Sequence, residues 1–103
     1  MAEVVWTPRA YADLEAIGAY HAQNAPGYAE LLVRKLMQAA ERLTSFPQSG
    51  RVVPEIGDAH MREVIHRNYR IVYLHIPAED KVEVLTVFHS SRQLGKPPGE
   101  ASL

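Results

Sequence analysis

The clearest pattern of apolar and polar positions lies between Pro26 and Phe46. Apolar residues recur there every three or four positions, which places them on one side of a helix: Ala29, Leu32, Val33, Leu36, Ala40 and Leu43. Proline is favoured in the first turn of a helix and cannot continue one, so Pro26 suits the start and Pro47 ends the segment. We therefore predict an amphipathic helix from Pro26 to about Phe46.

A shorter helix is predicted before it. Thr7 is a good N-cap, and Pro8 at the first helical position loses no needed N–H. One face then carries Ala10, Leu14, Ile17 and His21, and the helix is expected to end near Asn24. The short connection 24–27 implies that the two helices form an antiparallel hairpin. The apolar residues 3–6 before them predict a short strand.

The second half of the chain has the composition of strands. Three segments are rich in β-branched and aromatic residues, and they span 61–66, 69–76 and 81–89. Two short turns, 67–68 and 77–80, separate them, and 46–57 reads as a loop punctuated by proline and glycine. The predicted fold is α+β, with a short N-terminal strand, an antiparallel helical hairpin and a three-stranded antiparallel meander. We expect one domain over 1–95 and a flexible tail over 96–103.

One charged residue interrupts the apolar pattern of the middle strand. Arg70 shares a face with Val72 and Leu74 if side chains alternate. In a structural interpretation it stacks on a tyrosine and pairs with Glu63 or Glu83. In a functional interpretation it forms a polar patch with His89 and Arg92. Simple pairing of Ile76 with Lys81 would set Arg70 opposite Val87, with His89 diagonally next to it on the same face.

Composition and charge exclude several classes of function. The chain has 103 residues, 11 Lys and Arg against 12 Asp and Glu, and no cysteine. A protein that grips nucleic acid through its phosphates shows a clear basic excess, so direct nucleic-acid binding is not expected. The histidines lack the spacing of metal ligands, and no metal or cofactor is expected. No membrane span or signal peptide is recognised, and we expect a cytoplasmic protein.

Five segments in this order resemble the ParE/RelE superfamily of bacterial toxins. They are ADLEAI (12–17), LTSFPQSGR (43–51), MREVI (61–65), YRIVY (69–73) and VLTVFHSSR (84–92). The F-P-x-x-G-R loop and the aliphatic-x-x-x-H-x-x-R ending are closer to the ParE branch, and the resemblance covers residues 4–92. It implies the toxin of a type II toxin–antitoxin pair, neutralised by a small antitoxin. ParE-like toxins poison DNA gyrase, whereas RelE-like toxins cut mRNA on the ribosome.

The chemistry of RNA cleavage offers a way to compare the two branches. Cleavage without a metal needs a base, an acid and cations for the phosphate. If the chain is a ribonuclease, Glu63, Arg70, His89 and Arg92 are the candidates. No tyrosine follows His89, and no lysine lies between Lys35 and Lys81. The leading hypothesis is therefore a gyrase inhibitor, followed by a ribonuclease and by a non-toxic module that only binds an antitoxin.

Two sets of contact residues follow from the resemblance and the patterns. The candidates for target binding are Arg51, Arg62, Arg70, His89 and Arg92. Arg51 serves equally well as a cation beside the C-terminal carbonyls of the second helix, and His89 as a hydrogen-bonded structural histidine. Strands that are apolar on both faces need two covers, and the antitoxin is expected to supply the second. Its candidate contacts are Tyr28, Leu31, Met37, Tyr69, Ile71 and Tyr73.

Overall fold

The computed structural model describes residues 1–92, and the predicted tail 96–103 lies outside them. The chain forms a strand, two helices and then four strands. The elements are β1 (Glu3–Trp6), α1 (Pro8–Ala22), α2 (Pro26–Glu41), η1 (Arg42–Thr44), β2 (Arg51–Val52), β3 (Met61–His66), β4 (Tyr69–Ile76), η2 (Pro77–Glu79) and β5 (Lys81–His89). Both helices end slightly earlier than predicted, and a 3₁₀ turn follows α2. In the described part of the chain, no helix is long and apolar enough to cross a membrane.

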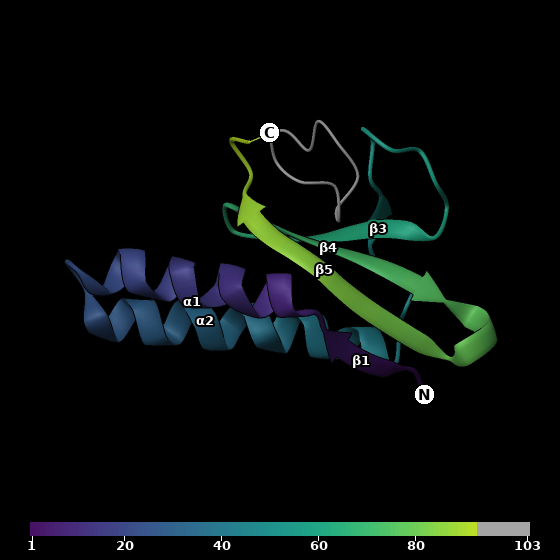
Figure 1. The fold of residues 1–103 in the computed structure, drawn as a ribbon, viewed down its shortest axis with the longest axis horizontal. Coiled ribbons are helices and arrows are strands. Elements are labelled where there is room, and N and C mark those ends of the chain that lie inside the picture. The colour runs from purple at the N-terminus through teal and green to yellow at the C-terminus, as the bar shows by residue number, and fades with distance from the viewer. Residues whose placement is uncertain (93–103) are drawn as a thin grey trace.

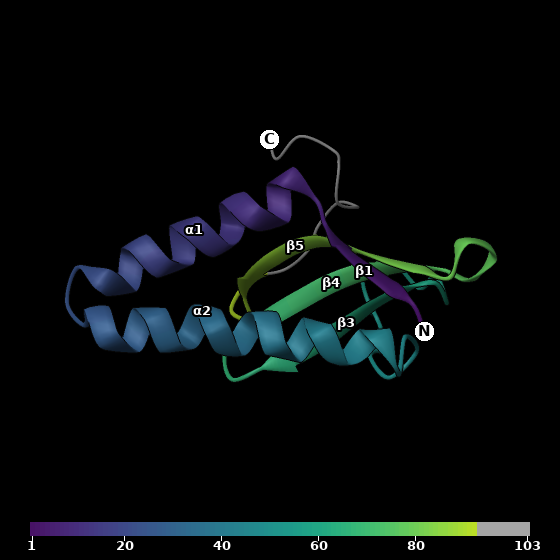
Figure 2. The same ribbon diagram turned by 90° about the horizontal axis from the view of Figure 1, so that it is seen from below.

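The strands form one mixed sheet in the order β1-β5-β4-β3-β2. The predicted meander, β3-β4-β5, is antiparallel throughout, whereas β1 pairs in parallel with β5. β2 pairs with β3 over two residues, in a segment that the sequence predicted as loop. The two helices of the hairpin lie side by side along one face of this sheet (Figures 1 and 2). The predicted α+β architecture is confirmed. The sheet contains β1 and β2 in addition to the three strands of the meander.

The helix-facing side of the sheet forms the core. Ile71 and Tyr73 are completely buried there and Tyr69 nearly so, together with Leu32 and Leu36 of α2. The prediction that these three β4 residues are available to an antitoxin is therefore wrong. Alternation along the strand does put them on one apolar face, but the chain's own helices already cover that face.

A β-bulge changes the register that the sequence predicted between β4 and β5. Ile76 is opposite Lys81 as expected, but the pairing shifts between Val72 and Tyr73, so that Arg70 faces Phe88. A bulge inserts one extra residue into one strand and reverses the side-chain alternation beyond it. The prediction that Arg70 and His89 share a face is wrong for this reason. His89 is opposite Tyr69, on the side of the helices.

Candidate functional site

A network of charged side chains lies on the sheet face opposite the helices. Glu63 of β3 is 1% exposed. One of its carboxylate oxygens accepts from Nε of Arg70 at 2.6 Å, and the other accepts from Nε of Arg51 at 2.6 Å. The register explains this meeting, because Arg51 is directly opposite Glu63, and Arg70 is two residues before the partner of Glu63 on β4.

Arg70 is held from a second direction by the turn that follows β2. Its two terminal nitrogens donate to the two carboxylate oxygens of Glu55, each at 2.8 Å. Such a two-pronged pair is among the strongest hydrogen-bonded contacts of arginine. The guanidinium also lies 5.0 Å from the ring centre of Phe88. These contacts use all three nitrogens of the guanidinium.

The electrostatics of the network favour a permanently charged Arg70. The hydrogen bonds to Glu55 raise its pKa, burial opposes this, and Glu63 raises the pKa further. Two arginines and two glutamates balance in charge, so the cluster adds no net positive potential. The structural interpretation is supported in its contact with Glu63, whereas Glu83 pairs with Lys81 and the stacked ring is Phe88.

Arg62 has a structural position beside this network. Its Nε donates to the carbonyl of Ala59 at 2.9 Å, and one terminal nitrogen donates to the carbonyls of Gly50 and Gln48. It therefore ties two loop segments to β3. Arg51 does not cap α2, because its side chain is directed to Glu63, although that side chain remains 60% exposed.

The remaining two candidates lie away from the network. His89 is exposed, its Nδ1 accepts from the backbone N–H of Ser91 at 3.1 Å, and its ring is 5.5 Å from that of Tyr69. Arg92 is exposed just after β5. Of the four residues predicted for ribonuclease chemistry, the structure joins the side chains of Glu63 and Arg70, while His89 and Arg92 share only a backbone hydrogen bond. Residues 1–92 contain no group of three side chains placed to hold a metal ion.

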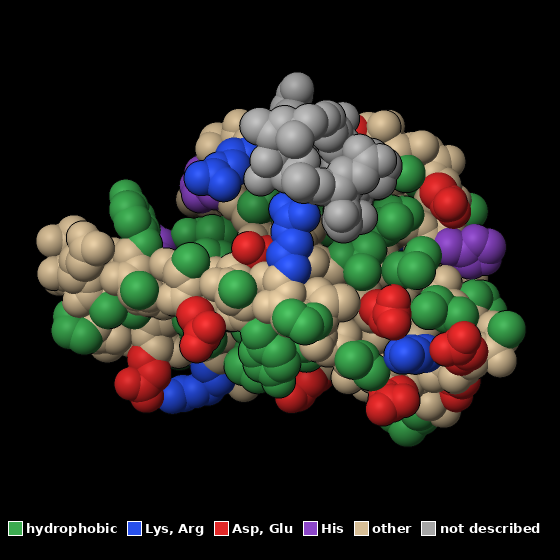
Figure 3. Space-filling model, viewed as in Figure 1, with side chains coloured by type: hydrophobic (Ala, Val, Ile, Leu, Met, Phe, Trp, Pro, Cys, Tyr) green, Lys and Arg blue, Asp and Glu red, His purple; other side chains and the backbone are tan. Residues whose placement is uncertain are grey.

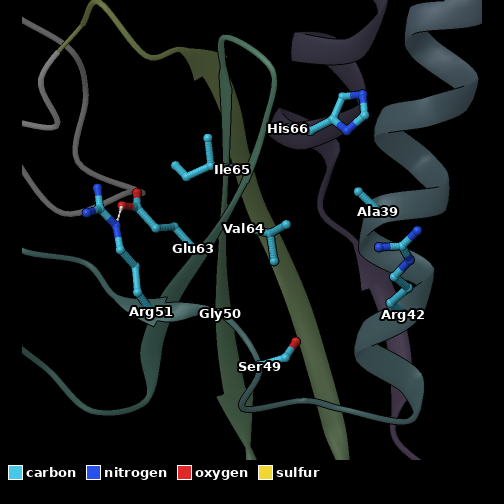
Figure 4. A pocket seen from close by; sticks show the side chains of 9 residues that line it. All are labelled: Ala39, Arg42, Ser49, Gly50, Arg51, Glu63, Val64, Ile65 and His66. Carbon is cyan, nitrogen blue, oxygen red and sulfur yellow. Dashed lines mark hydrogen bonds and ion pairs between the residues drawn. The ribbon is translucent and has the colours of Figure 1, made fainter.

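A separate hollow of about 320 Å³ lies where α2 passes the edge of β3 (Figure 4). Figure 4 shows Val64 and His66 directed toward the helix, and Ile65 and Glu63 directed to the other side of the strand. Ala39 and Arg42 form the helical wall, and the segment 49–51 closes one end. The sequence prediction missed this hollow because it treated β2 as loop. It therefore could not show at which residue the pairing of β2 with β3 ends.

His66 gives the hollow an unusual polar group. Its Nε2 atom is buried and has no hydrogen-bond partner among the described residues. Burial lowers the pKa of His66 most, and the charges of Arg67, Lys35 and Arg42 lower it further. Three cations are therefore close enough to oppose a positive charge on the ring of His66. The signal in the sequence was the histidine at the end of an edge strand, together with Lys35 and Arg42 on the facing helix.

Comparison with known proteins establishes the family. Residues 4–94 match the family model described as the ParE toxin of the type II toxin-antitoxin system, parDE. The chain belongs to the ParE/RelE family of type II toxins. It is also 34% identical over 92 residues to Toxin RelE2 of Caulobacter vibrioides, covering 89% of this chain and 99% of that protein.

Solved structures share the fold of this ParE/RelE-family toxin at low sequence identity. A chain of the chromosomal ParDE system from P. aeruginosa matches with a TM-score of 0.72 and 20% identity, over 86% of this chain and 96% of that one. A chain of the RelBE2 toxin–antitoxin complex from Mycobacterium tuberculosis matches with a TM-score of 0.64 and 19% identity, over 85% and 96%. The fold is thus common to proteins named for both branches.

Proposed function

We propose that this toxin is a ParE-like inhibitor of DNA gyrase that a cognate antitoxin neutralises. The observation that carries the proposal is the state of Arg70, which is 6% exposed and directs all three of its guanidinium nitrogens to Glu63 and Glu55. The ParE description of the matching family model supports the same branch. The toxin acts in this proposal by binding its target in the cytoplasm.

The arrangement of the other polar groups argues against RNA cleavage. An RNA-cleaving site needs a base, an acid and free cations around one phosphate. His89 lies on the helix side of the sheet and Arg70 on the opposite side, so they do not converge. The acidic and basic side chains are interspersed in the described part of the face that Figure 3 shows, and the chain carries a net charge of −1. No basic surface for RNA is seen in that view.

A RelE-like ribonuclease remains the second candidate, because the 34% identical relative is named Toxin RelE2. A toxin that has lost its activity and only binds an antitoxin is the third. Both share the fold and the partner with the main proposal, so the deciding property is the target.

The antitoxin partner is proposed from structural neighbours that belong to toxin–antitoxin systems and complexes. Tyr28 and Leu31 are each 45% exposed on α2 and remain candidates for contact with it. Met37 is half-buried and packs against the core, which leaves little of it for a partner. For the target, the exposed candidates are His89, Arg92 and Arg51, whereas Arg62 and Arg70 are engaged within the chain.

Induced expression in bacteria tests the proposal through two readouts. A gyrase inhibitor is expected to induce the SOS response and filamentation, and the purified toxin to inhibit supercoiling by gyrase. Rapid arrest of translation with cleavage of ribosome-bound mRNA would show the RelE-like activity instead. Normal growth at a confirmed level of folded toxin would show the inactive module.

A further inference from the structure

Among the described residues, no strand pairs with the outer edge of β3 over its last three residues. β2 covers only Arg62 and Glu63 of β3. The chain leaves the sheet edge at Gly50, whose N–H donates to the hydroxyl of Tyr73 at 3.0 Å instead of continuing the ladder. Within residues 1–92, the segment 64–66 therefore has a strand on one side only, where it pairs with Ile71, Arg70 and Tyr69. An open edge is a template for a strand from another chain.

The hollow described above straddles this open edge. Val64 and His66 are directed toward α2, and Ile65 is directed to the other side, where it is 47% exposed (Figure 4). A strand added beside β3 would alternate its side chains in the same way. One set would enter between β3 and α2, beside Ala39 and Arg42, and the other would cover Ile65.

The charges on the helix side favour an acidic side chain on the added strand. Three cations act on His66: Lys35 from α2, Arg42 from the 3₁₀ turn that follows it, and Arg67 from the turn between β3 and β4. The buried Nε2 of His66 lacks a hydrogen-bond partner in residues 1–92. The carboxylate in the lining of the hollow, that of Glu63, is directed to the opposite side and is already bound by two arginines. A carboxylate entering between Arg42 and His66 would complement this charge and satisfy the histidine.

We propose that an extended acidic segment of the cognate antitoxin adds to β3 at residues 64–66 and places a carboxylate between Arg42 and His66. The proposal rests on the proposed antitoxin partner and not on the identity of the toxin's target. It assigns Arg42 and His66 a role in partner choice, since opposite charges at an interface suppress wrong partners as well as attract the right one.

Charge reversal at Arg42 tests the proposal in cells that express toxin and antitoxin together. Arg42→Glu is expected to lower the affinity for the antitoxin at least about tenfold, because it sets two carboxylates against each other. The toxin should then inhibit growth despite the antitoxin. The matched control is Arg34→Glu, an exposed arginine of α2 that pairs with Glu30, and it should be neutralised like the wild type. Equal neutralisation of both variants would overturn the proposal.

Suppressor selection identifies the partner residue. Antitoxin variants that neutralise Arg42→Glu are expected to replace Asp or Glu by Lys or Arg within one extended segment. Suppressors that map to helical segments without a change of charge would contradict the proposal. If the wild-type toxin does not inhibit growth, co-purification of the variants with the antitoxin gives the same comparison, so failure of the gyrase hypothesis is distinguishable from failure of this one.

A labelling experiment needs no charge change and keeps the test independent of the folding of Arg42→Glu. The chain has no cysteine, so Ile65→Cys provides a single reactive thiol at the open edge. It should react with a maleimide in the free toxin and be protected in the purified toxin–antitoxin complex. Glu79→Cys, at the exposed turn between β4 and β5, should react in both. A reactive Ile65→Cys in the complex would contradict strand addition at this edge.

Discussion

At the scale of single residues, the fold depends on one buried carboxylate that binds two arginines. Glu63 is almost fully buried and accepts from both Arg51 and Arg70. The side chain of Arg70 is only 7% exposed, whereas that of Arg51 is largely in solvent. Removing one partner of a buried pair leaves an uncompensated charge, which costs more than the pair itself contributes.

Replacement of Glu63 should therefore destabilise the toxin severely. We expect Glu63→Gln to lower the free energy of unfolding by about 3–5 kcal/mol, because Arg70 stays buried and keeps only Glu55. Urea denaturation followed by circular dichroism measures this loss. Glu79→Gln, on an exposed side chain 4.0 Å from Lys81, should change stability by less than about 1 kcal/mol. Similar losses for both variants would refute the central role of Glu63.

The half-buried imidazole of His66, whose Nε2 atom is buried, predicts a dependence of stability on pH. Its pKa is lower in the folded state than its ordinary value of about 6.5, so the unfolded chain binds a proton more readily. The stabilising contribution of neutral His66 is complete above that value and is lost as the pH falls below it. Between about pH 7.5 and 5.5, His66→Gln should therefore lose less stability than the wild type in urea denaturation.

His60→Gln provides the control for that comparison, because His60 is exposed. It should retain the wild-type loss of stability at acid pH. If His66→Gln and the wild type lose stability equally, the environment of His66 in the hollow is not as described.

Residue-level prediction from the sequence was partly correct. Alternation placed Arg70 on the face opposite Ile71 and Tyr73, and it suggested Glu63 as a partner. It did not find Glu55, which belongs to a turn whose path depends on the short pairing of β2 with β3. Nor did it find Phe88, because the bulge between β4 and β5 has no clear signal in the sequence.

At the scale of elements, the loop from Phe46 to Arg51 is fixed by one tyrosine. The hydroxyl of Tyr73 donates to the carbonyl of Pro47 at 2.8 Å and accepts from the N–H of Gly50. Burial raises the pKa of Tyr73, so the hydroxyl keeps its proton. The F-P-x-x-G-R segment thus supplies a carbonyl, a close backbone approach and the arginine that binds Glu63.

Gly50 allows this approach because it has no side chain. A Cβ at this position would lie 2.6 Å from the carbonyl oxygen of Glu63 and 2.8 Å from the hydroxyl of Tyr73. Gly50→Ala should therefore destabilise the toxin by about 1–3 kcal/mol through overpacking. Gly27→Ala, in the first turn of α2, meets no atom within 4 Å and should be neutral or stabilising by up to about 1 kcal/mol. Thermal unfolding of the pair tests this difference.

The edge of β5 beyond β1 is closed by α1. The carboxylate of Asp13 accepts from the hydroxyl of Thr86 at 2.6 Å and from the N–H of Val87 at 3.0 Å. Asp13→Leu leaves both buried donors without this acceptor and should cost about 1–3 kcal/mol. Glu15→Leu, an exposed position of the same helix, is the control. Faster hydrogen exchange at the amide of Val87 in Asp13→Leu alone would confirm the cause.

Periodicity in the sequence predicted the long elements well. Helical stripes and β-branched runs gave α1, α2 and the three strands of the meander, because burial of one face imposes that spacing. β2 was missed because two residues are too few to show alternation. The parallel pairing of β1 with β5 was not predicted either, since it joins the two ends of the chain.

At the scale of the whole molecule, the balance of charge distinguishes the proposed functions. The charge of Arg70 is balanced by its ion pairs with Glu55 and Glu63, and the whole chain has a net charge of −1. RNA binding requires cations that release counterions from phosphates. The free toxin should therefore show no saturable binding to a single-stranded RNA of about 20 nucleotides at about 150 mM salt. Fluorescence anisotropy measures this, and saturable, salt-sensitive binding would favour the ribonuclease.

The first strand of the toxin is secured by the last one. The backbone N–H of Thr7 donates to the carbonyl of Val84, and its side chain bonds the same carbonyl across 77 positions of sequence. A ribosome releases the N-terminus first, and contacts so remote in the chain form late. β1 therefore remains unpaired until β5 has left the exit tunnel of the ribosome. A message truncated before β5 yields a product that lacks the partner strand of β1 and cannot complete the sheet. Such a fragment is not expected to fold into the toxin.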